Sequence, residues 1–263
     1  MSPTQPVCLI TGASAGIGAA LAREFARAGH RLALTARSQD GLAAVADEIA
    51  AAGHARPQTI AADLGHPDGV AHLAEALSAA GLEPAFLVNN AGFGLLGAAD
   101  AAPDRHLAII DLNCRALTDL SLRWIDSITR QRGGILNVAS VAAFLPGPGM
   151  TVYHATKAYV LSLTEALHSE LASEGVRVCA LCPGPVPTGF NKRGGIPDGF
   201  FPDYLACSAE EVARAGYEGF MGGHRVVVPG RLNRLATLLP RLLPRDLVRE
   251  VMQRRWRKAR RGG

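Results

Sequence analysis

The chain has 263 residues, of which 48% are hydrophobic and 19% charged, and its formal net charge is +4. This composition supplies enough apolar side chains for a buried core and excludes an intrinsically disordered protein. No apolar run approaches the roughly 20 residues of a membrane-spanning helix, and residues 1–6 are too short and polar for a signal peptide. The five cysteines are odd in number and scattered, so we expect a soluble cytoplasmic protein without a disulfide framework.

Short apolar runs alternate with longer helical stretches, which is typical of a parallel sheet with crossover helices. Strands are predicted at residues 7–11, 31–36, 57–62, 85–89, 134–139, 176–182 and 225–228. Helices are predicted between them at residues 16–28, 40–52, 67–80, 103–132, 151–174 and 208–220. Gly29 marks the end of the first helix, and Ser208 with Glu211 forms a capping box at the start of the last.

The predicted strands are almost entirely apolar, so both faces of the sheet should be covered by helices. The sequence therefore predicts an α/β fold of the Rossmann type, a doubly wound parallel sheet of about seven strands with helices on both faces. Ligands are expected at the carboxyl ends of the strands. We assign residues 1–230 to one domain, which includes an irregular Gly-, Pro- and Phe-rich loop at residues 183–205.

A glycine-rich turn follows the first strand and opens the first helix, with the sequence Gly12-Ala13-Ser14-Ala15-Gly16-Ile17-Gly18. Glycines let the backbone approach a pyrophosphate closely, and a helix N-terminus offers unpaired N–H groups and partial positive charge. The turn therefore indicates a dinucleotide site.

Tyr153 and Lys157 lie four residues apart in a predicted helix, so they share one face of it. An ammonium about 4 Å from the phenol would lower the tyrosine pKa by about 3 units, toward the neutral range where acid–base catalysis is effective. Ser140 lies just past the fifth strand, at the edge of the sheet where the glycine-rich turn is also expected. The three side chains can thus converge on one ligand.

These motifs occur in a fixed order: a G-x-x-x-G-x-G turn, Asn89-Asn90-Ala91-Gly92 after the fourth strand, and Tyr153-x-x-x-Lys157 preceded by Ser140. The set resembles the classical short-chain dehydrogenase/reductase family, over roughly residues 7–230. The resemblance implies an enzyme that transfers a hydride between a nicotinamide and a carbonyl or alcohol. It implies that Ser140 binds the substrate oxygen, that Tyr153 is the general acid/base, and that Lys157 holds the nicotinamide ribose. Asn113 matches the fourth catalytic residue of the family, which holds a water.

The resemblance also implies which residues bind the dinucleotide. Asp63 is expected at the adenine, Asn89 at the adenine-side ribose, and residues 183–188 at the nicotinamide carboxamide. The full set is Gly12, Ser14, Gly16, Ile17, Gly18, Arg37, Asp63, Asn89, Ala91, Gly92, Tyr153, Lys157, Pro183, Gly184, Val186 and Thr188.

The end of the second strand decides between the two nucleotides. An acid there would bind the ribose hydroxyls of NAD, but this chain has Ala36-Arg37-Ser38. Arg37 can pair with a 2′-phosphate and Ser14 can add a hydroxyl, which favours NADP(H) over NAD(H). A dual preference stays open, because the family's other basic position, in the turn, is Ala15.

The substrate is expected to be lipophilic, because mostly apolar residues fall in the loops near the site. They are Phe93, Leu95, Val141, Ala142, Phe144, Met150, Phe190, Phe200 and Phe201. No metal is expected: Cys179 and Cys182 lie on a strand and point to opposite faces, and the histidines show no paired spacing.

Residues 231–263 form a basic extension with a net charge of +9, which leaves −5 for residues 1–230. Leucines, valines and Trp256 alternate there with arginines, and Pro240 and Pro244 interrupt the pattern. The extension is expected to form a helix that docks on the domain or a second subunit and leaves its basic face in solvent; contact with an anionic membrane ranks second, and nucleic acid is not expected. The resemblance implies a homodimer or homotetramer formed by the two helices at residues 103–132 and 151–174.

Two other functions compete with a reductase. A regulatory protein could bind the dinucleotide without turnover, but it would not need the complete set of Ser140, Tyr153, Lys157 and Asn113. Epimerases and dehydratases share the Tyr-x-x-x-Lys motif, but they have a different glycine spacing and a larger substrate domain.

Overall fold

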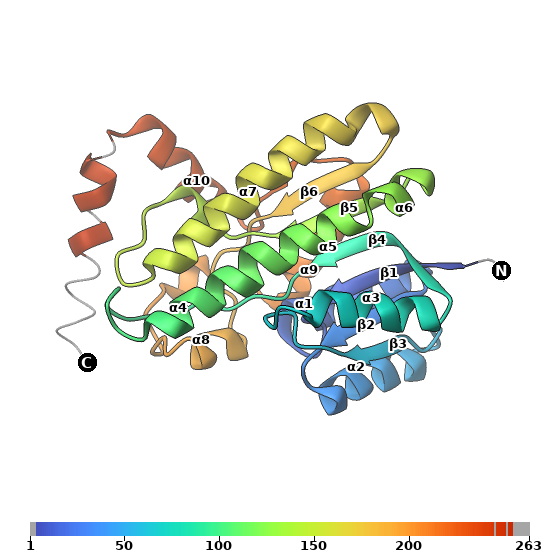
Figure 1. Cartoon of the computed structure of the whole chain (residues 1–263). Coiled ribbons are helices and arrows are strands. Elements are labelled where there is room, and N and C mark those ends of the chain that lie inside the picture. The colour runs from blue at the N-terminus through green and yellow to red at the C-terminus, as the bar shows by residue number, and fades with distance from the viewer. Residues whose placement is uncertain (1–3, 245, 251, 255–263) are drawn as a thin grey trace.

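The computed structural model describes residues 4–244, 246–250 and 252–254. Seven parallel strands form one sheet in the order β3-β2-β1-β4-β5-β6-β7 (Figure 1). They are β1 (Gln5–Thr11), β2 (Leu32–Ala36), β3 (Gln58–Ala61), β4 (Leu82–Asn89), β5 (Gly134–Val138), β6 (Arg177–Leu181) and β7 (Val226–Val227). The predicted fold class is confirmed, and all seven predicted strands are present.

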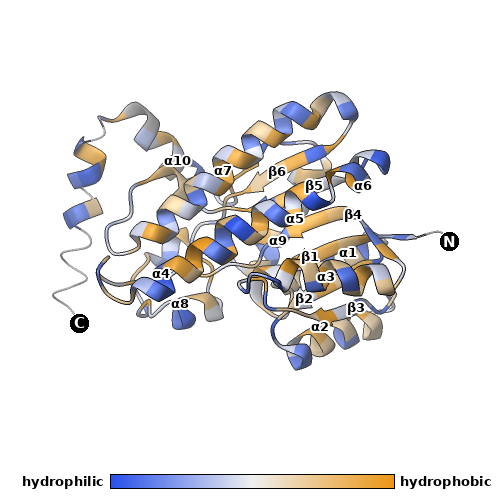
Figure 2. Ribbon diagram, viewed as in Figure 1, coloured by the Kyte–Doolittle hydropathy of each residue, from blue (hydrophilic) through white to orange (hydrophobic). Residues whose placement is uncertain are grey.

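Helices cover both faces of the sheet, because successive strand side chains point to opposite sides. Cys8 and Ile10 of β1 pack in one core, and Val7 and Leu9 pack in the other. The first core is covered by α1 (Gly16–Arg27), α2 (Gln39–Ala51) and α9 (Ala209–Met221). The second is covered by α3 (Gly69–Ala79), α5 (Leu117–Arg123), α6 (Ile125–Arg130) and α7 (Thr151–Leu171). Figure 2 shows the hydrophobic strands enclosed between these two layers.

The two helix ends predicted from the sequence, the end of α1 and the start of α9, are confirmed. Gly29 follows α1 with a φ of +83°, a conformation that glycine adopts without strain. At the start of α9 the Ser208 hydroxyl accepts from the Glu211 N–H, and the Glu211 carboxylate accepts from the Ser208 N–H.

The helix predicted at residues 103–132 is not continuous. It consists of α4 (Pro103–Ile110), a π-helical segment (Asp111–Ala116), α5 and α6, and Trp124 leaves the helical region at φ −114° between the last two. The π-helical turn lies where the Asn113 side chain bonds to the backbone of Phe93, an interaction from outside the helix. The apolar periodicity of the segment carries no signal of that contact.

α8 (Gly189–Arg193) in the irregular loop was not predicted, whereas α10 (Arg231–Leu242) is the helix expected in the basic extension. α10 continues past Pro240, where the sequence predicted an interruption. Of the apolar residues noted in the extension, Val251 and Trp256 lie outside the described residues. No helix in the described part of the chain is both long and apolar enough to cross a bilayer.

The strand order reverses between β1 and β4. After β1 the chain moves outward through β2 to β3, and after β4 it moves the other way through β5, β6 and β7. The loops that leave the carboxyl ends of β1 and β4 therefore diverge and open a cleft between them.

Candidate active site

A cleft of about 1160 Å³ lies at this strand reversal. Its wall contains most of the residues that the sequence assigned to the site: Gly12, Ser14, Gly16, Ile17, Arg37, Asp63, Ala91, Gly92, Ser140, Tyr153, Lys157, Pro183, Gly184, Val186 and Thr188. Gly18, Asn89 and Asn113 do not line it. The structure thus brings together side chains and backbone from segments spread over the whole sheet edge.

The glycine-rich turn is held by close backbone contacts. Gly12 and Gly16 have positive φ values of +63° and +57°. A Cβ at Gly18 would lie 2.3 Å from the Gly12 carbonyl oxygen and 2.4 Å from Asn90 Nδ2, so Gly18 allows the start of α1 to pack on the turn. Its placement favours this structural role over the direct cofactor contact that we expected from the sequence.

Asn90, not Asn89, faces the cleft. Asn90 Nδ2 donates to the carbonyls of Thr11 (2.9 Å) and Gly12 (3.1 Å), which joins the loops that follow β1 and β4. Asn89 is 2% exposed, and its Nδ2 donates to Ser121 Oγ and Asn137 Oδ1 inside the protein. Neighbouring strand residues point in opposite directions, so only one of the two asparagine side chains can face the cleft.

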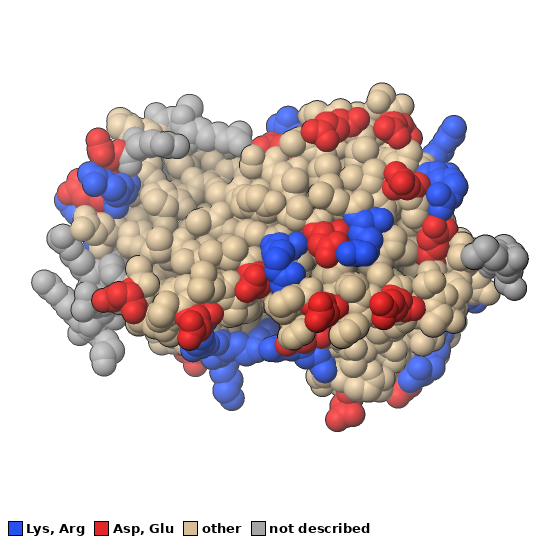
Figure 3. All heavy atoms as spheres, viewed as in Figure 1, with Lys and Arg blue, Asp and Glu red and all other residues tan. Residues whose placement is uncertain are grey.

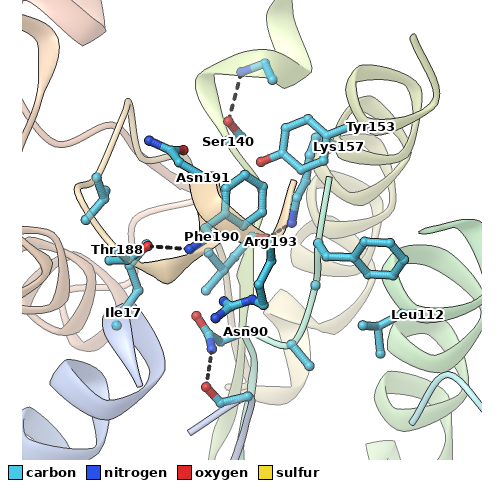
Figure 4. A pocket seen from close by; sticks show the side chains of 18 of the residues that line it. Ile17, Asn90, Leu112, Ser140, Tyr153, Lys157, Thr188, Phe190, Asn191 and Arg193 are labelled. Carbon is cyan, nitrogen blue, oxygen red and sulfur yellow. Dashed lines mark hydrogen bonds between the residues drawn. The ribbon is translucent and has the colours of Figure 1, made fainter. Parts of the chain in front are cut away.

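Ser140, Tyr153 and Lys157 meet on one wall of the cleft (Figure 4). Ser140 Oγ accepts from the Ala142 N–H at 3.1 Å and donates to the Pro183 carbonyl at 3.4 Å, and its hydroxyl is close enough to the Tyr153 phenol to affect its pKa. Lys157 is 5% exposed; its Nζ donates to the Val138 carbonyl at 2.7 Å and lies 5.8 Å from the centre of the Tyr153 ring. Tyr153 and Lys157 therefore lie on the same face of α7, as the sequence predicted.

The two pKa values differ from the expectation that Lys157 would bring Tyr153 toward neutrality. Burial raises the pKa of Tyr153 to about 12, against the opposing effect of the nearby Ser140 hydroxyl. Burial also lowers the pKa of Lys157 to about 8. Lys157 Nζ donates to the Val138 carbonyl rather than to the phenol oxygen. Removal from water is therefore the main cause of the pKa shift of both side chains.

Asn113 lies behind the cleft wall in the π-helical segment. Its Nδ2 donates to the Phe93 carbonyl (3.0 Å) and to Thr156 Oγ1 (3.1 Å), and its Oδ1 accepts from the Phe93 N–H (3.1 Å). Only glycine fits at position 92, where a Cβ would lie 2.9 Å from Asn113 Oδ1 and 3.6 Å from Lys157 Nζ. Asn113 thus positions the loop that passes Lys157.

Arg37 and Ser14 line the far end of the cleft, beyond the carboxyl end of β2. No acidic side chain in the described part of the chain pairs with Arg37. Asp63 lines the same end, and its Oδ1 accepts from the Gly65 N–H at 3.0 Å.

The opposite end of the cleft is closed by segments that the motifs did not identify. Phe190 of α8 lies beside Tyr153, with 5.5 Å between ring centres. Residues missed from the sequence also line the cleft: Arg105, His154, Arg193, Leu205, Asn233, Ala236 and Met252. Several come from α4 or the C-terminal extension, and no local pattern links them to the motifs. Within the described ranges, no three His, Cys, Asp or Glu side chains gather where they could hold a metal ion.

The fold and cleft are those of a dinucleotide-binding oxidoreductase. The model of the short chain dehydrogenase family matches residues 6–195, and the chain belongs to this family. The chain is similar to sulfoacetaldehyde reductase 2 of Chromohalobacter salexigens, with 35% identity over 218 residues that cover 79% of this chain and 85% of the relative. Like its named relatives, it is an enzyme that acts between CH–OH and C=O groups.

Two solved structures show the same fold with different nucleotides. One is a short-chain dehydrogenase from Sphingobium yanoikuyae in complex with NADPH, at 34% identity and a TM-score of 0.79, covering 89% of this chain and 92% of that one. The other is the 3-ketoacyl-(acyl-carrier-protein) reductase from Brucella melitensis complexed with NADH, at 30% identity and a TM-score of 0.73, covering 82% and 91%.

The lowered pKa of Lys157 predicts a pH-dependent stability. The folded protein releases this proton near pH 8, whereas the unfolded chain holds it until about pH 10.5. Between these values the unfolded state binds more protons, so this group makes the free energy of unfolding rise with pH, by up to about 1.4 kcal/mol per pH unit. Urea unfolding of wild type and Lys157→Met at pH 7.5, 8.5 and 9.5 should therefore show wild type gaining stability relative to the variant. Lys192→Met, which removes an exposed lysine of α8, is the control, and a constant wild-type-to-Lys157→Met difference would contradict the prediction.

Proposed function

We propose that the protein is an NADP(H)-dependent carbonyl reductase or alcohol dehydrogenase in which Tyr153 is the general acid/base. The observation that carries the proposal is the convergence of Ser140, Tyr153 and Lys157 on the cleft that the glycine-rich turn and Arg37 also line. The alternative of a regulatory protein without turnover has no need of this constellation.

The residues of the cleft fit a dinucleotide. Gly12 and Gly16 line the cleft without side chains, and Ala15, which caps α1, has no side-chain group to bond to the first N–H donors of the helix. Such donors at a helix N-terminus suit a pyrophosphate. When bound, the nicotinamide would supply or accept the hydride.

Side chains of the protein would carry out the proton transfer. A tyrosine with a raised pKa keeps its proton at neutral pH, so Tyr153 enters a reduction as the acid and can transfer that proton to the substrate oxygen as negative charge develops there. Ser140, which lies next to Tyr153 on the cleft wall, would hold the same oxygen. Lys157 would stabilise the resulting phenolate by its charge, while Asn113 fixes the loop beside Lys157.

The substrate is proposed to be lipophilic. Apolar side chains surround the end of the cleft next to Tyr153: Phe93, Val141, Ala142, Leu145, Met150, Phe190, Phe200, Phe201 and Leu205. Leu95 and Phe144, also expected there from the sequence, are not among the lining residues. A largely apolar wall around one reactive hydroxyl favours aryl, long-chain or ring ketones over sugars.

The decisive assay follows NADPH oxidation at 340 nm with a panel of aryl, long-chain and polar ketones. We expect turnover of the apolar members and a loss of about 10²- to 10⁴-fold in kcat for Tyr153→Phe, because the proton donor is removed. Tyr159→Phe is the matched control, since Tyr159 lies on the same helix, is 43% exposed and bonds to Thr118.

Equal activity of the Tyr153→Phe and Tyr159→Phe variants would refute Tyr153 as the acid. Nucleotide binding without turnover of any panel member would favour the regulatory alternative. Faster reduction of sugars than of aryl ketones would overturn the lipophilic substrate.

Nucleotide preference should depend on Arg37. We expect Arg37→Gln to weaken NADPH binding about 10-fold or more and to leave NADH binding unchanged, because only NADPH carries the 2′-phosphate. Arg31→Gln removes an exposed arginine at the opposite end of β2 and serves as the control. Equal weakening of both nucleotides by Arg37→Gln would remove the basis for an NADP(H) preference.

We propose that α4, α5 and α7 form the interface between two copies of the chain. Large apolar side chains are exposed there, namely Leu107 (59%), Ile110 (43%), Leu122 (54%) and Tyr159 (43%). Figure 3 shows few charged side chains over the N-terminal part of α7, whereas charged side chains are present around α4. Sedimentation equilibrium should give a mass of at least twice the 27.5 kDa of one chain, and a monomer at micromolar concentration would contradict the pairing.

The basic extension is proposed to serve mainly as a wall of the cleft. Asn233 of α10 is 2% exposed and lines the cleft, so the start of α10 is docked on the domain. Leu232, Leu235 and Leu238 are 47–53% exposed on its outer side. Membrane contact through these leucines stays a prediction.

A further inference from the structure

Arg193, the last residue of α8, has a guanidinium that the proposed chemistry does not use. It lines the cleft, and its side chain points into the cleft toward Asn90 in Figure 4. Its Nη1 lies 2.9 Å from the position that a Cβ at Gly189 would occupy. The charge therefore sits over the start of α8, inside the cleft wall.

The start of α8 lies directly against the glycine-rich turn. A Cβ at Gly16 would be 3.2 Å from Thr188 Cγ2, and Thr188 Oγ1 accepts from the Phe190 N–H at 3.4 Å. Since Gly189 follows Thr188, the Arg193 guanidinium is brought near the turn that opens α1.

The far end of α8 is held as well. The Leu96 N–H donates to the Gly194 carbonyl at 2.9 Å, and Arg105 Nη2 donates to the Arg193 carbonyl at 3.5 Å. These backbone contacts fix the end of the helix and leave the Arg193 side chain to extend into the cleft.

The charges around the cleft are unbalanced. Arg37, Arg105, Lys157 and Arg193 line it, against the single carboxylate of Asp63. Arg193 has no acidic partner among the described residues. Arg37 lies past β2, whereas Arg193 lies by the glycine-rich turn, so the two arginines face different parts of an elongated anionic ligand.

We propose that Arg193 binds the pyrophosphate of the dinucleotide, on the side of it opposite the N-terminus of α1. This rests on the proposed function, in which the cleft holds a dinucleotide. A guanidinium can donate two parallel hydrogen bonds to phosphate oxygens, which complements the backbone N–H groups of the turn. Because NADPH and NADH share the pyrophosphate, Arg193 serves both nucleotides equally, in contrast to Arg37.

The test measures Kd values for NADPH and NADH separately, from the quenching of tryptophan fluorescence, without substrate. Wild type, Arg193→Gln, Arg193→Lys and Lys192→Gln are compared at the same ionic strength. Lys192 is the matched control, because it is the neighbouring exposed cation of α8 and does not line the cleft. We expect Arg193→Gln to weaken both nucleotides by the same factor, about 10- to 100-fold, Arg193→Lys to weaken them less, and Lys192→Gln to leave both unchanged.

Three outcomes would overturn the assignment. Kd values for Arg193→Gln that match those of Lys192→Gln would show that the guanidinium does not touch the nucleotide. Weakening of NADPH alone would move Arg193 to the 2′-phosphate, and unchanged Kd values with a raised KM for anionic ketones would move it to the substrate. If wild type binds neither nucleotide, the proposed function itself fails, which separates that failure from a failure at Arg193.

Discussion

The site depends on the junction between the loops that leave β1 and β4. In a parallel sheet whose strand order reverses, these two loops leave the sheet in opposite directions, which opens the ligand cleft. Contacts between the first residues of the two loops then fix the shape of the cleft. Two side chains make this junction. The Asn90 amide donates to the Thr11 and Gly12 carbonyls, and the Thr11 hydroxyl accepts from the N–H groups of Asn90 and Ala91 at 3.0 Å each. Gly18 packs onto the same point, so the turn, the start of α1 and the loop after β4 are fixed relative to one another.

A second set of buried polar contacts fixes α7 on the sheet. Lys157 Nζ bonds to the end of β5 at Val138, and Asn137 Nδ2, one residue earlier in β5, donates to Thr164 Oγ1 of the same helix at 2.9 Å. Thr156 connects α7 to Asn113. Buried polar groups of this kind are costly unless each finds a partner, so they specify one register of the helix against the strand. Tyr153 owes its position beside Ser140 to that register.

Local patterns were sufficient to predict the fold, and most of the residues that they proposed for the site line one cleft. The apolar strands, the glycine-rich turn and the four-residue spacing of Tyr153 and Lys157 each express one element or one helix face, and the structure has them as predicted. Asn89 was expected at the nucleotide, whereas the side chain of its neighbour Asn90 faces the cleft, because the direction in which the chain leaves β4 determines which of the two points toward it. The pKa of Tyr153 could not be derived from spacing alone either, since it depends on burial and on where the Lys157 ammonium points.

The end of the cleft next to Tyr153 could not be predicted from the sequence for a different reason. It is formed where the loop after β6 meets the C-terminal extension, and the contact is specific: a Cβ at Gly184 would lie 2.4 Å from the Asn233 amide, whose Nδ2 donates to the Leu205 and Pro229 carbonyls at 3.0 Å. One buried amide thus ties the irregular loop, the end of the sheet and α10 into a single wall. The family match ends at residue 195, before most of that wall. Under the proposed function, substrate choice resides in a part of the molecule whose residues are joined by tertiary packing, while the proton chemistry resides at the carboxyl ends of the strands, where local motifs identify the residues.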